Sequence, residues 1–280
     1  MDIQWPLVIF SLLAGCGGIL FAFEGVAEFL GVGKKIRFKA TIIALVLLVV
    51  GGIASVFHLG QPANIMAAAA NIGSFSGISV EIIVLGIDII LALIYLLVVR
   101  GENESVSKVI GVLGIIGGVL IAFVTGNGYV MESQVTWNTI FLPLAYLGTA
   151  LSMGATLYAS LIFAEKTEGD AAADVLPSEW DKIKNIVLGC AIAGFALTLF
   201  YGIAVGFALD IIAYWICALL IGGVGTTVCV FMVGKQKSLI YVALVCAVIG
   251  ALGLRCAMWL AGSGFLEFFQ DAAGRIVLGL

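Results

Sequence analysis

Long apolar stretches fill most of the chain, and short polar segments separate them. A membrane-spanning helix needs about 20 predominantly apolar residues. The pattern therefore predicts an all-α integral membrane protein with eight transmembrane helices in a single membrane domain, residues 1–280. The expected spans lie at roughly 5–31, 38–60, 79–100, 107–130, 139–165, 181–205, 208–233 and 237–262.

Composition supports the same class of protein. Apolar residues make up 62% of the chain and charged residues 11%, with a mean hydropathy of +1.22. Soluble domains carry roughly a quarter charged residues. The first apolar stretch is too long for the h-region of a signal peptide, and no basic n-region precedes it, so we expect it to be the first span.

The basic residues cluster in every second connection between the predicted spans. These connections hold eleven of the thirteen: Lys34, Lys35, Arg37, Lys39, Arg100, Lys108, Lys166, Lys182, Lys184, Lys235 and Lys237. Cytoplasmic loops retain an excess of Lys and Arg. We therefore expect both termini on the outer side of the cytoplasmic membrane. Apart from segment 34–39 no basic run is present, which argues against a nucleic-acid partner.

Cysteine and histidine limit the redox groups that the protein could carry. No two of the six cysteines have C-x-x-C spacing, which argues against an iron–sulfur cluster, a zinc site or a disulfide framework. His58 is the only histidine, so a bis-histidine haem is excluded and only His–Met ligation stays open. We expect no haem, cluster or metal in this chain.

Three ionisable residues fall at a similar depth near the outer ends of predicted spans. His58 lies at the end of span two, Glu81 at the start of span three and Arg255 toward the end of span eight. Ionisable groups inside a membrane are costly and often functional. Histidine titrates near neutral pH and a carboxylate can take a proton from a hydroxyl, so His58 and Glu81 suit the oxidation of a quinol. We predict a quinol site there, with Arg255 as a further contact.

Each of these residues also has an ordinary structural interpretation. His58 at a helix end could cap backbone carbonyls. Glu81 could be a helix-start acid favoured by the macrodipole. Arg255 could extend its charged end to the lipid head groups.

Further acids lie on the predicted helices. Asp88 follows Glu81 by seven residues and should share its face, two turns deeper. Glu24 and Glu28, one turn apart near the inner end of span one, either pair with Lys34 or Lys35 or open an inward proton path. The favoured interpretation is pairing.

Glycine supplies 36 residues and is concentrated in short runs within the predicted spans. Segments 15–18, 111–118 and 222–225 are examples, and small residues of this kind let helix backbones approach closely. No Lys follows them as in a phosphate-binding loop. We expect close helix packing at these runs.

The segment 63–79 is apolar but too short to span the membrane. It could form an interfacial helix and turn over the His58 region, or a plain surface connection.

Several motifs together resemble a known family. Segment 5–7 reads Trp-Pro-Leu with Phe10 nearby, segment 55–62 reads Ser-Val-Phe-His-Leu-Gly-Gln-Pro, and Glu81 opens span three. These resemble the membrane-anchor subunit of anaerobic dimethyl sulfoxide reductases, and the His-Leu-Gly-x-Pro segment is the most specific part. Near the C-terminus, Arg255-Cys256-Ala257-Met258-Trp259 departs from the family tendency of an Arg followed closely by Phe-Tyr.

The resemblance implies partners and roles. Such a subunit anchors a molybdopterin catalytic subunit and an iron–sulfur electron-transfer subunit on the outer face, oxidises menaquinol and passes the electrons to the nearest cluster. By resemblance, the functional histidine maps onto His58 and the quinol-linked glutamate onto Glu81.

Three other functions fit parts of the pattern. A quinone-interacting anchor of the polysulfide or nitrite reductase type would differ in span number or electron direction. An ion-coupled secondary transporter would use Asp88, Glu24 and Glu28 as a midplane ion path and would show broken helices or an inverted repeat. A purely structural anchor would leave the quinol site in a partner.

Overall fold

The computed structural model describes residues 2–58, 72–74, 76–101, 103–165 and 176–262. Within these ranges the chain is helical and contains no strand. The helices are α1 (Trp5–Leu30), α2 (Arg37–Val56), η1 (Ile72–Ser74), α4 (Gly77–Arg100), α5 (Glu104–Asn127), α6 (Phe141–Ala164), α7 (Trp180–Val205), η2 (Leu209–Ile211), α8 (Ile212–Trp215), η3 (Ile216–Gly225), α9 (Thr226–Met232) and α10 (Leu239–Ala261). Among the described residues, eight helical stretches are long and apolar enough to cross a membrane, as predicted.

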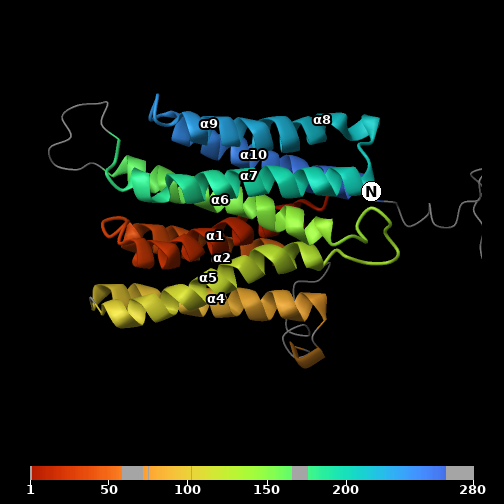
Figure 1. Cartoon of the computed structure of the whole chain (residues 1–280). Helices are drawn as coiled ribbons and strands as arrows, with labels where there is room; N and C mark the ends of the chain where they lie inside the picture. Colours follow the sequence, from red (N-terminus) through yellow and green to blue (C-terminus); the bar gives the residue numbers. More distant parts are fainter. Residues whose placement is uncertain (1, 59–71, 75, 102, 166–175, 263–280) are drawn as a thin grey trace, which may run out of the picture.

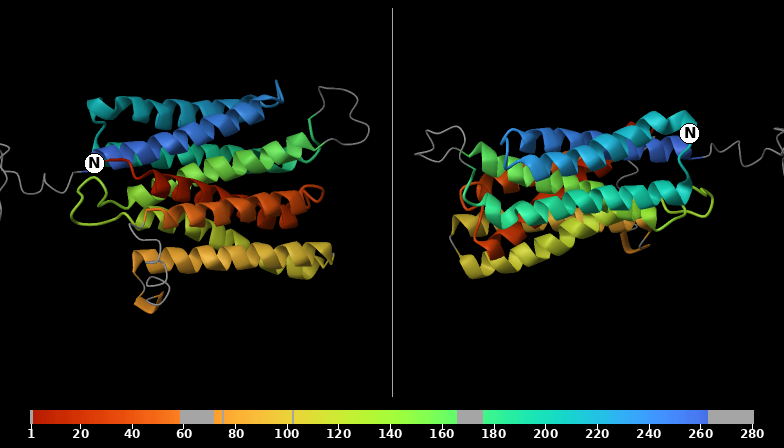
Figure 2. Two further views of the ribbon diagram at one scale, coloured as in Figure 1. Left: turned by 180° about the vertical axis from the view of Figure 1, so that it is seen from behind. Right: turned by 45° about the horizontal axis from the view of Figure 1, so that its top comes forward.

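The spans form one bundle, with α4 at one edge and α8–α9 at the other (Figure 1). Helix α1 occupies the middle, where it packs against α2, α5 and α6. Helix α10 packs against α6 on one side and against η3 and α9 on the other. Two further views show the same order of helices (Figure 2).

The connections alternate between the two ends of the bundle. The α1–α2, α4–α5 and α9–α10 connections, the end of α6 and the start of α7 lie at one end (Figure 1). Most of the basic residues of the described chain lie in these connections or in the adjoining helix ends, so this end is hereafter the basic end. The start of α1, the end of α2 and the last turn of α10 lie at the other end (Figures 1 and 2). His58 directly follows α2, so this is hereafter the His58 end. An even number of spans places the start of α1 and the finish of α10 together, as the charge pattern predicts.

Helix boundaries follow local chemistry. Asn103 caps α5 by accepting a hydrogen bond of 3.2 Å from the backbone N–H of Val106, so this span begins three residues before its predicted start. Gly31 ends α1 in the left-handed conformation, with φ of 63°. Helix α2 ends at Val56, and the rest of its predicted span reaches residues 59 and 60, which lie outside the described residues.

Glycines bring α1 and α5 into close contact, as the glycine runs predict. A Cβ atom on Gly111 would lie 2.9 Å from the Cα of Gly25, and one on Gly18 would lie 3.1 Å from the Cα of Gly118. Any side chain at these positions would push the helices apart. Close backbone approach of this kind is the usual basis of helix association in membranes.

The seventh span contains a π-helical stretch. Residues Ile216–Gly225 have π-helical hydrogen bonding between the short helices α8 and α9. Within this stretch, Gly222 meets Gly250 of α10 so closely that a Cβ atom on either would collide with the other. Just after it, the Thr226 hydroxyl donates to the Ala243 carbonyl at 3.4 Å. These contacts hold the π turn against α10.

Candidate functional site

A cavity of about 250 Å³ lies at the His58 end, between the ends of four helices. Its walls are mainly apolar, and a few polar groups face into it. Pockets of this kind, apolar with a small number of polar groups, suit small organic ligands. The lining residues are Leu7, Phe10, Ser55, Val56, His58, Ile78, Glu81, Ile82, Leu85, Gly128 and Tyr129. Thus α2 and α4 are neighbours, and His58 and Glu81 share one cavity.

His58 follows the end of α2 and contacts its own helix. Its Nδ1 makes a hydrogen bond with the backbone carbonyl of Ser55. Because a carbonyl oxygen can only accept, Nδ1 must carry the proton. In the neutral ring the lone pair is then on Nε2, which can accept a proton. The capping interpretation is therefore correct for one nitrogen and leaves the other for chemistry.

Glu81 lies on α4 just beyond the first turn, which contains no acidic residue. The start of α4 is capped by Ser76, whose hydroxyl accepts a hydrogen bond of 3.3 Å from the backbone N–H of Ser79. The Glu81 carboxylate lies against the chain after α5, where a Cβ atom on Gly128 would approach Oε1 to 2.5 Å. The helix-start interpretation of Glu81 is wrong, because the macrodipole acts within the first turn.

Arg255 does not line the cavity. Its side chain is fully buried, so the interpretation that it reaches lipid head groups is wrong. The guanidinium donates hydrogen bonds to Ser11 Oγ (2.8 Å), the Ser11 carbonyl (3.1 Å), the Ala251 carbonyl (3.0 Å) and Thr149 Oγ1 (3.3 Å). It also lies 4.5 Å from the centre of the Tyr146 ring.

Tyr129 connects the cavity with this buried cation and was missed by the sequence analysis. Its ring centre lies 5.8 Å from that of Tyr146, which covers Arg255, and 5.6 Å from that of Trp259. Two aromatic rings therefore lie between the cavity and the guanidinium. The signal available in the sequence was a hydroxyl-bearing aromatic residue at the outer end of predicted span four (107–130), at the same end as His58.

The comparison with known proteins decides the family. A model of the DMSO reductase anchor subunit family (DmsC) matches residues 1–253. The chain belongs to this family. This confirms the resemblance drawn from segment 55–62 and Glu81.

Curated relatives agree with this assignment. Over 168 residues the protein is 29% identical to the anaerobic dimethyl sulfoxide reductase chain YnfH of Escherichia coli K12, covering 58% of this chain and 59% of the relative. It is also 29% identical over 168 residues to an anaerobic dimethyl sulfoxide reductase chain of Haemophilus influenzae Rd, covering 58% and 60%. The match thus spans about three-fifths of each relative.

A second acid of this DmsC-family protein lies deeper on the face that carries Glu81. Asp88 is fully buried, and a Cβ atom on Gly117 of α5 would collide with its Oδ1. Glu81 and Asp88 therefore both face the α5 side, as their spacing predicts. Neither carboxylate oxygen of Asp88 has a hydrogen-bond partner within the described ranges.

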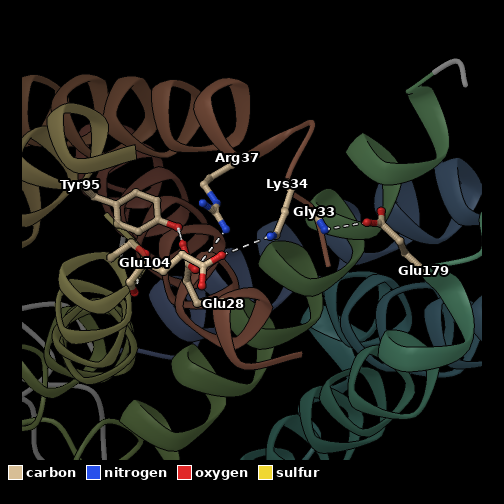
Figure 3. A network of polar contacts seen from close by, with 8 residues as sticks. Glu28, Gly33, Lys34, Arg37, Tyr95, Glu104 and Glu179 are labelled. Carbon is tan, nitrogen blue, oxygen red and sulfur yellow. Dashed lines mark hydrogen bonds and ion pairs between the residues drawn. The ribbon is translucent and has the colours of Figure 1, made fainter. Parts of the chain in front are cut away.

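The basic end holds a network of charged groups (Figure 3). Glu28 pairs with Arg37 at 3.0 Å and accepts a hydrogen bond of 2.6 Å from the Tyr95 hydroxyl. Lys34 instead pairs with Glu104 of α5 at 3.4 Å. The expectation of pairing is correct for Glu28, but the expected partners were wrong. Arg37 begins α2 directly after the tight turn and lies beside Glu28, whereas Lys34 lies in the turn and reaches α5.

Glu24 differs from Glu28 although one helical turn separates them. Its side chain is 1% exposed, and both carboxylate oxygens lack a hydrogen-bond partner in the part of the chain that the structure describes. The expected pairing of Glu24 with a lysine is therefore wrong.

The structure does not decide whether the segment 63–79 forms an interfacial helix and turn, because residues 63–71 and 75 lie outside the described residues.

Proposed function

We propose that the protein is the membrane anchor of a dimethyl sulfoxide reductase complex and oxidises menaquinol in the cavity at the His58 end. One observation carries the proposal: His58, which follows the end of α2, and Glu81, on α4, line the same apolar cavity. We place this end on the outer side of the cytoplasmic membrane, because the opposite end carries the basic connections.

The chemistry needs two proton acceptors and a route for two electrons. Oxidation of a quinol to a quinone releases two protons and two electrons. The Nε2 atom of His58 accepts one proton and the carboxylate of Glu81 accepts the other. Apolar residues such as Phe10 and Leu85 contact the quinol ring, and its isoprenoid tail extends into the lipid.

The electrons leave through partner subunits. An iron–sulfur subunit docks on the outer face beside His58 and accepts the electrons, and a molybdopterin catalytic subunit carries out the terminal reduction. The names of the two curated relatives, both chains of anaerobic dimethyl sulfoxide reductases, support this assembly. The anchor itself contributes the quinol site and the membrane attachment.

The test compares quinol-driven reduction by the purified complex in wild type, His58→Ala and Glu81→Gln. A parallel assay supplies the catalytic subunit with an artificial donor and so bypasses the anchor. We expect either substitution to lower the quinol-driven rate roughly 100-fold or more, since positioned acid–base groups contribute about that much. The rate with the artificial donor should not change.

Asp181→Asn is the matched control, because Asp181 is an exposed acid in the first turn of α7, and α7 begins at the basic end. Intact quinol-driven activity in both cavity variants would move the quinol site into a partner subunit. The protein would then be a structural anchor only.

A further inference from the structure

Tyr129 is a polar residue of the cavity at the His58 end to which the proposed mechanism gives no role. It lies in the connection after α5 and directly follows Gly128, against which the Glu81 carboxylate lies. Tyr129 and Glu81 therefore belong to the same wall of the cavity, whereas His58 lies at the end of α2.

The hydroxyl of Tyr129 is the one that the protein leaves for a ligand. Among the described residues that line the cavity, only Ser55 and Tyr129 carry a hydroxyl group. The Ser55 hydroxyl already donates to the Gly52 carbonyl at 2.7 Å. Within the described ranges the Tyr129 hydroxyl makes no hydrogen bond, whereas that of Tyr201 donates to the Thr136 carbonyl at 3.2 Å. A polar group in such a site normally has a partner, and a bound ligand can supply it.

Aromatic contacts fix the ring of Tyr129 before any ligand binds. Its centre lies 5.9 Å from the ring of Trp137, 5.8 Å from that of Tyr146 and 5.6 Å from that of Trp259. Trp137 is held in turn, because its Nε1 donates to the Met258 carbonyl at 2.9 Å. A donor fixed in this way needs no reorganisation when charge develops beside it.

A buried cation lies behind these rings. The guanidinium of Arg255 lies 4.5 Å from the centre of the Tyr146 ring, and no carboxylate within the described ranges pairs with it. Burial raises the pKa of Tyr129 well above its ordinary value, so the hydroxyl stays protonated at neutral pH, and the charge of Arg255 acts on this pKa in the opposite direction. The field of the guanidinium thus reaches the cavity wall, where it favours an anion.

We propose that Tyr129 is a further catalytic residue of the quinol site, whose hydroxyl donates a hydrogen bond to the quinol oxygen that loses its proton to Glu81. This inference rests on the proposed function. The O–H bond of the quinol breaks and a new O–H bond forms on the Glu81 carboxylate. The hydrogen bond from Tyr129 strengthens as negative charge develops on the quinol oxygen. Tyr129 keeps its own proton, and both electrons pass to the iron–sulfur subunit.

The test compares Tyr129→Phe with wild type in the purified complex, with a menaquinol analogue as donor. Phenylalanine keeps the ring contacts and removes only the hydroxyl. We expect kcat for quinol oxidation to fall roughly 10- to 100-fold, as for the loss of one donor to a developing anion. KM should change little, because the hydrogen bond strengthens only in the transition state. The rate with an artificial donor to the catalytic subunit should not change.

Tyr201→Phe is the matched control, because it removes a tyrosine hydroxyl that holds the same connection and does not line the cavity. A melting measurement on each complex reports whether it is folded. An equal loss of kcat in the two variants would assign the effect to loosening of the connection and would overturn the catalytic role. A higher KM at unchanged kcat would also overturn it, since the hydroxyl would then contribute to binding alone.

The variants His58→Ala and Glu81→Gln separate the two proposals. If both lose quinol-driven activity while folded Tyr129→Phe keeps the wild-type kcat, the role of Tyr129 is overturned and the quinol site stands. If both keep quinol-driven activity, the proposed function fails and the role of Tyr129 fails with it.

Discussion

The hydroxyl of Tyr95 on α4 donates a hydrogen bond of 2.6 Å to Glu28 on α1, although 67 positions separate the two residues in the sequence. The same carboxylate is paired with Arg37, and its side chain is 3% exposed. A buried charge with these two partners is well satisfied. Removing either partner would leave the buried carboxylate without compensation and would lower the stability of the protein.

The ion pair between Glu28 and Arg37 should therefore contribute strongly to stability. We expect Arg37→Met to destabilise the protein by roughly 3–5 kcal/mol, because it leaves an uncompensated buried carboxylate. The double variant Arg37→Met, Glu28→Gln should recover much of this loss. Unfolding of the purified protein in detergent measures both. Lys34→Met breaks an exposed pair and should cost only about 0–1 kcal/mol. Equal losses in the single and double variants would contradict this account.

The position of the Glu81 carboxylate can be changed without altering Glu81. Gly128 has φ of −59°, so alanine is compatible with the backbone there, but its Cβ atom would approach Glu81 Oε1 to 2.5 Å. We expect Gly128→Ala to lower quinol-driven activity about 10- to 100-fold by displacing the carboxylate. Gly86→Ala on α4 meets no atom within 4 Å and serves as the control. Equal activity in the two variants would show that the carboxylate does not act from this position.

Arg255 should not be replaceable by lysine. No carboxylate within the described ranges pairs with it, and its guanidinium is held by hydrogen bonds to Ser11, Thr149 and Ala251. A lysine ammonium is more strongly hydrated and cannot span these acceptors. We expect Arg255→Lys to be less stable than Arg255→Met by about 1–3 kcal/mol in a denaturant titration. A more stable lysine variant would mean that the charge itself is the stabilising element.

The contact between Gly222 and Gly250 predicts a sharp contrast between two glycines. Gly250→Leu should destabilise the protein by at least about 1–3 kcal/mol, because the side chain would collide with the backbone of η3. Gly189→Leu on α7 has open space around it and should be tolerated. Thermal unfolding in detergent compares them. Equal melting temperatures would show that α10 and η3 can separate without cost.

The sequence contained enough information to predict the spans, because span length and apolar content are local properties. Loop charge and the even number of spans likewise predicted that the start of α1 and the last turn of α10 would lie together. The shared face of Glu81 and Asp88 followed from helical periodicity alone. These predictions needed no knowledge of which helices are neighbours.

Predictions that depended on helix neighbours were less successful. His58 and Glu81 share a cavity because α2 packs against α4, whereas Arg255 lies behind the rings of Tyr129 and Tyr146. Residues at the same depth in the membrane can lie far apart in the membrane plane. The sequence does not give this lateral separation, which decides the groups that touch. The partner of Glu28 depends in the same way on the tight turn before α2.

The π-helical stretch Ile216–Gly225 has a consequence for length variation in the family. A π turn contains more residues than an α turn, so the stretch can lose one residue and return to α-helical hydrogen bonding. Thr226 would keep its contact with Ala243 on α10. The same deletion within α10 would rotate all later residues by about 100° and turn Arg255 away from Ser11. Relatives of different length should therefore carry their single-residue gaps in the seventh span, and α10 should keep a constant length.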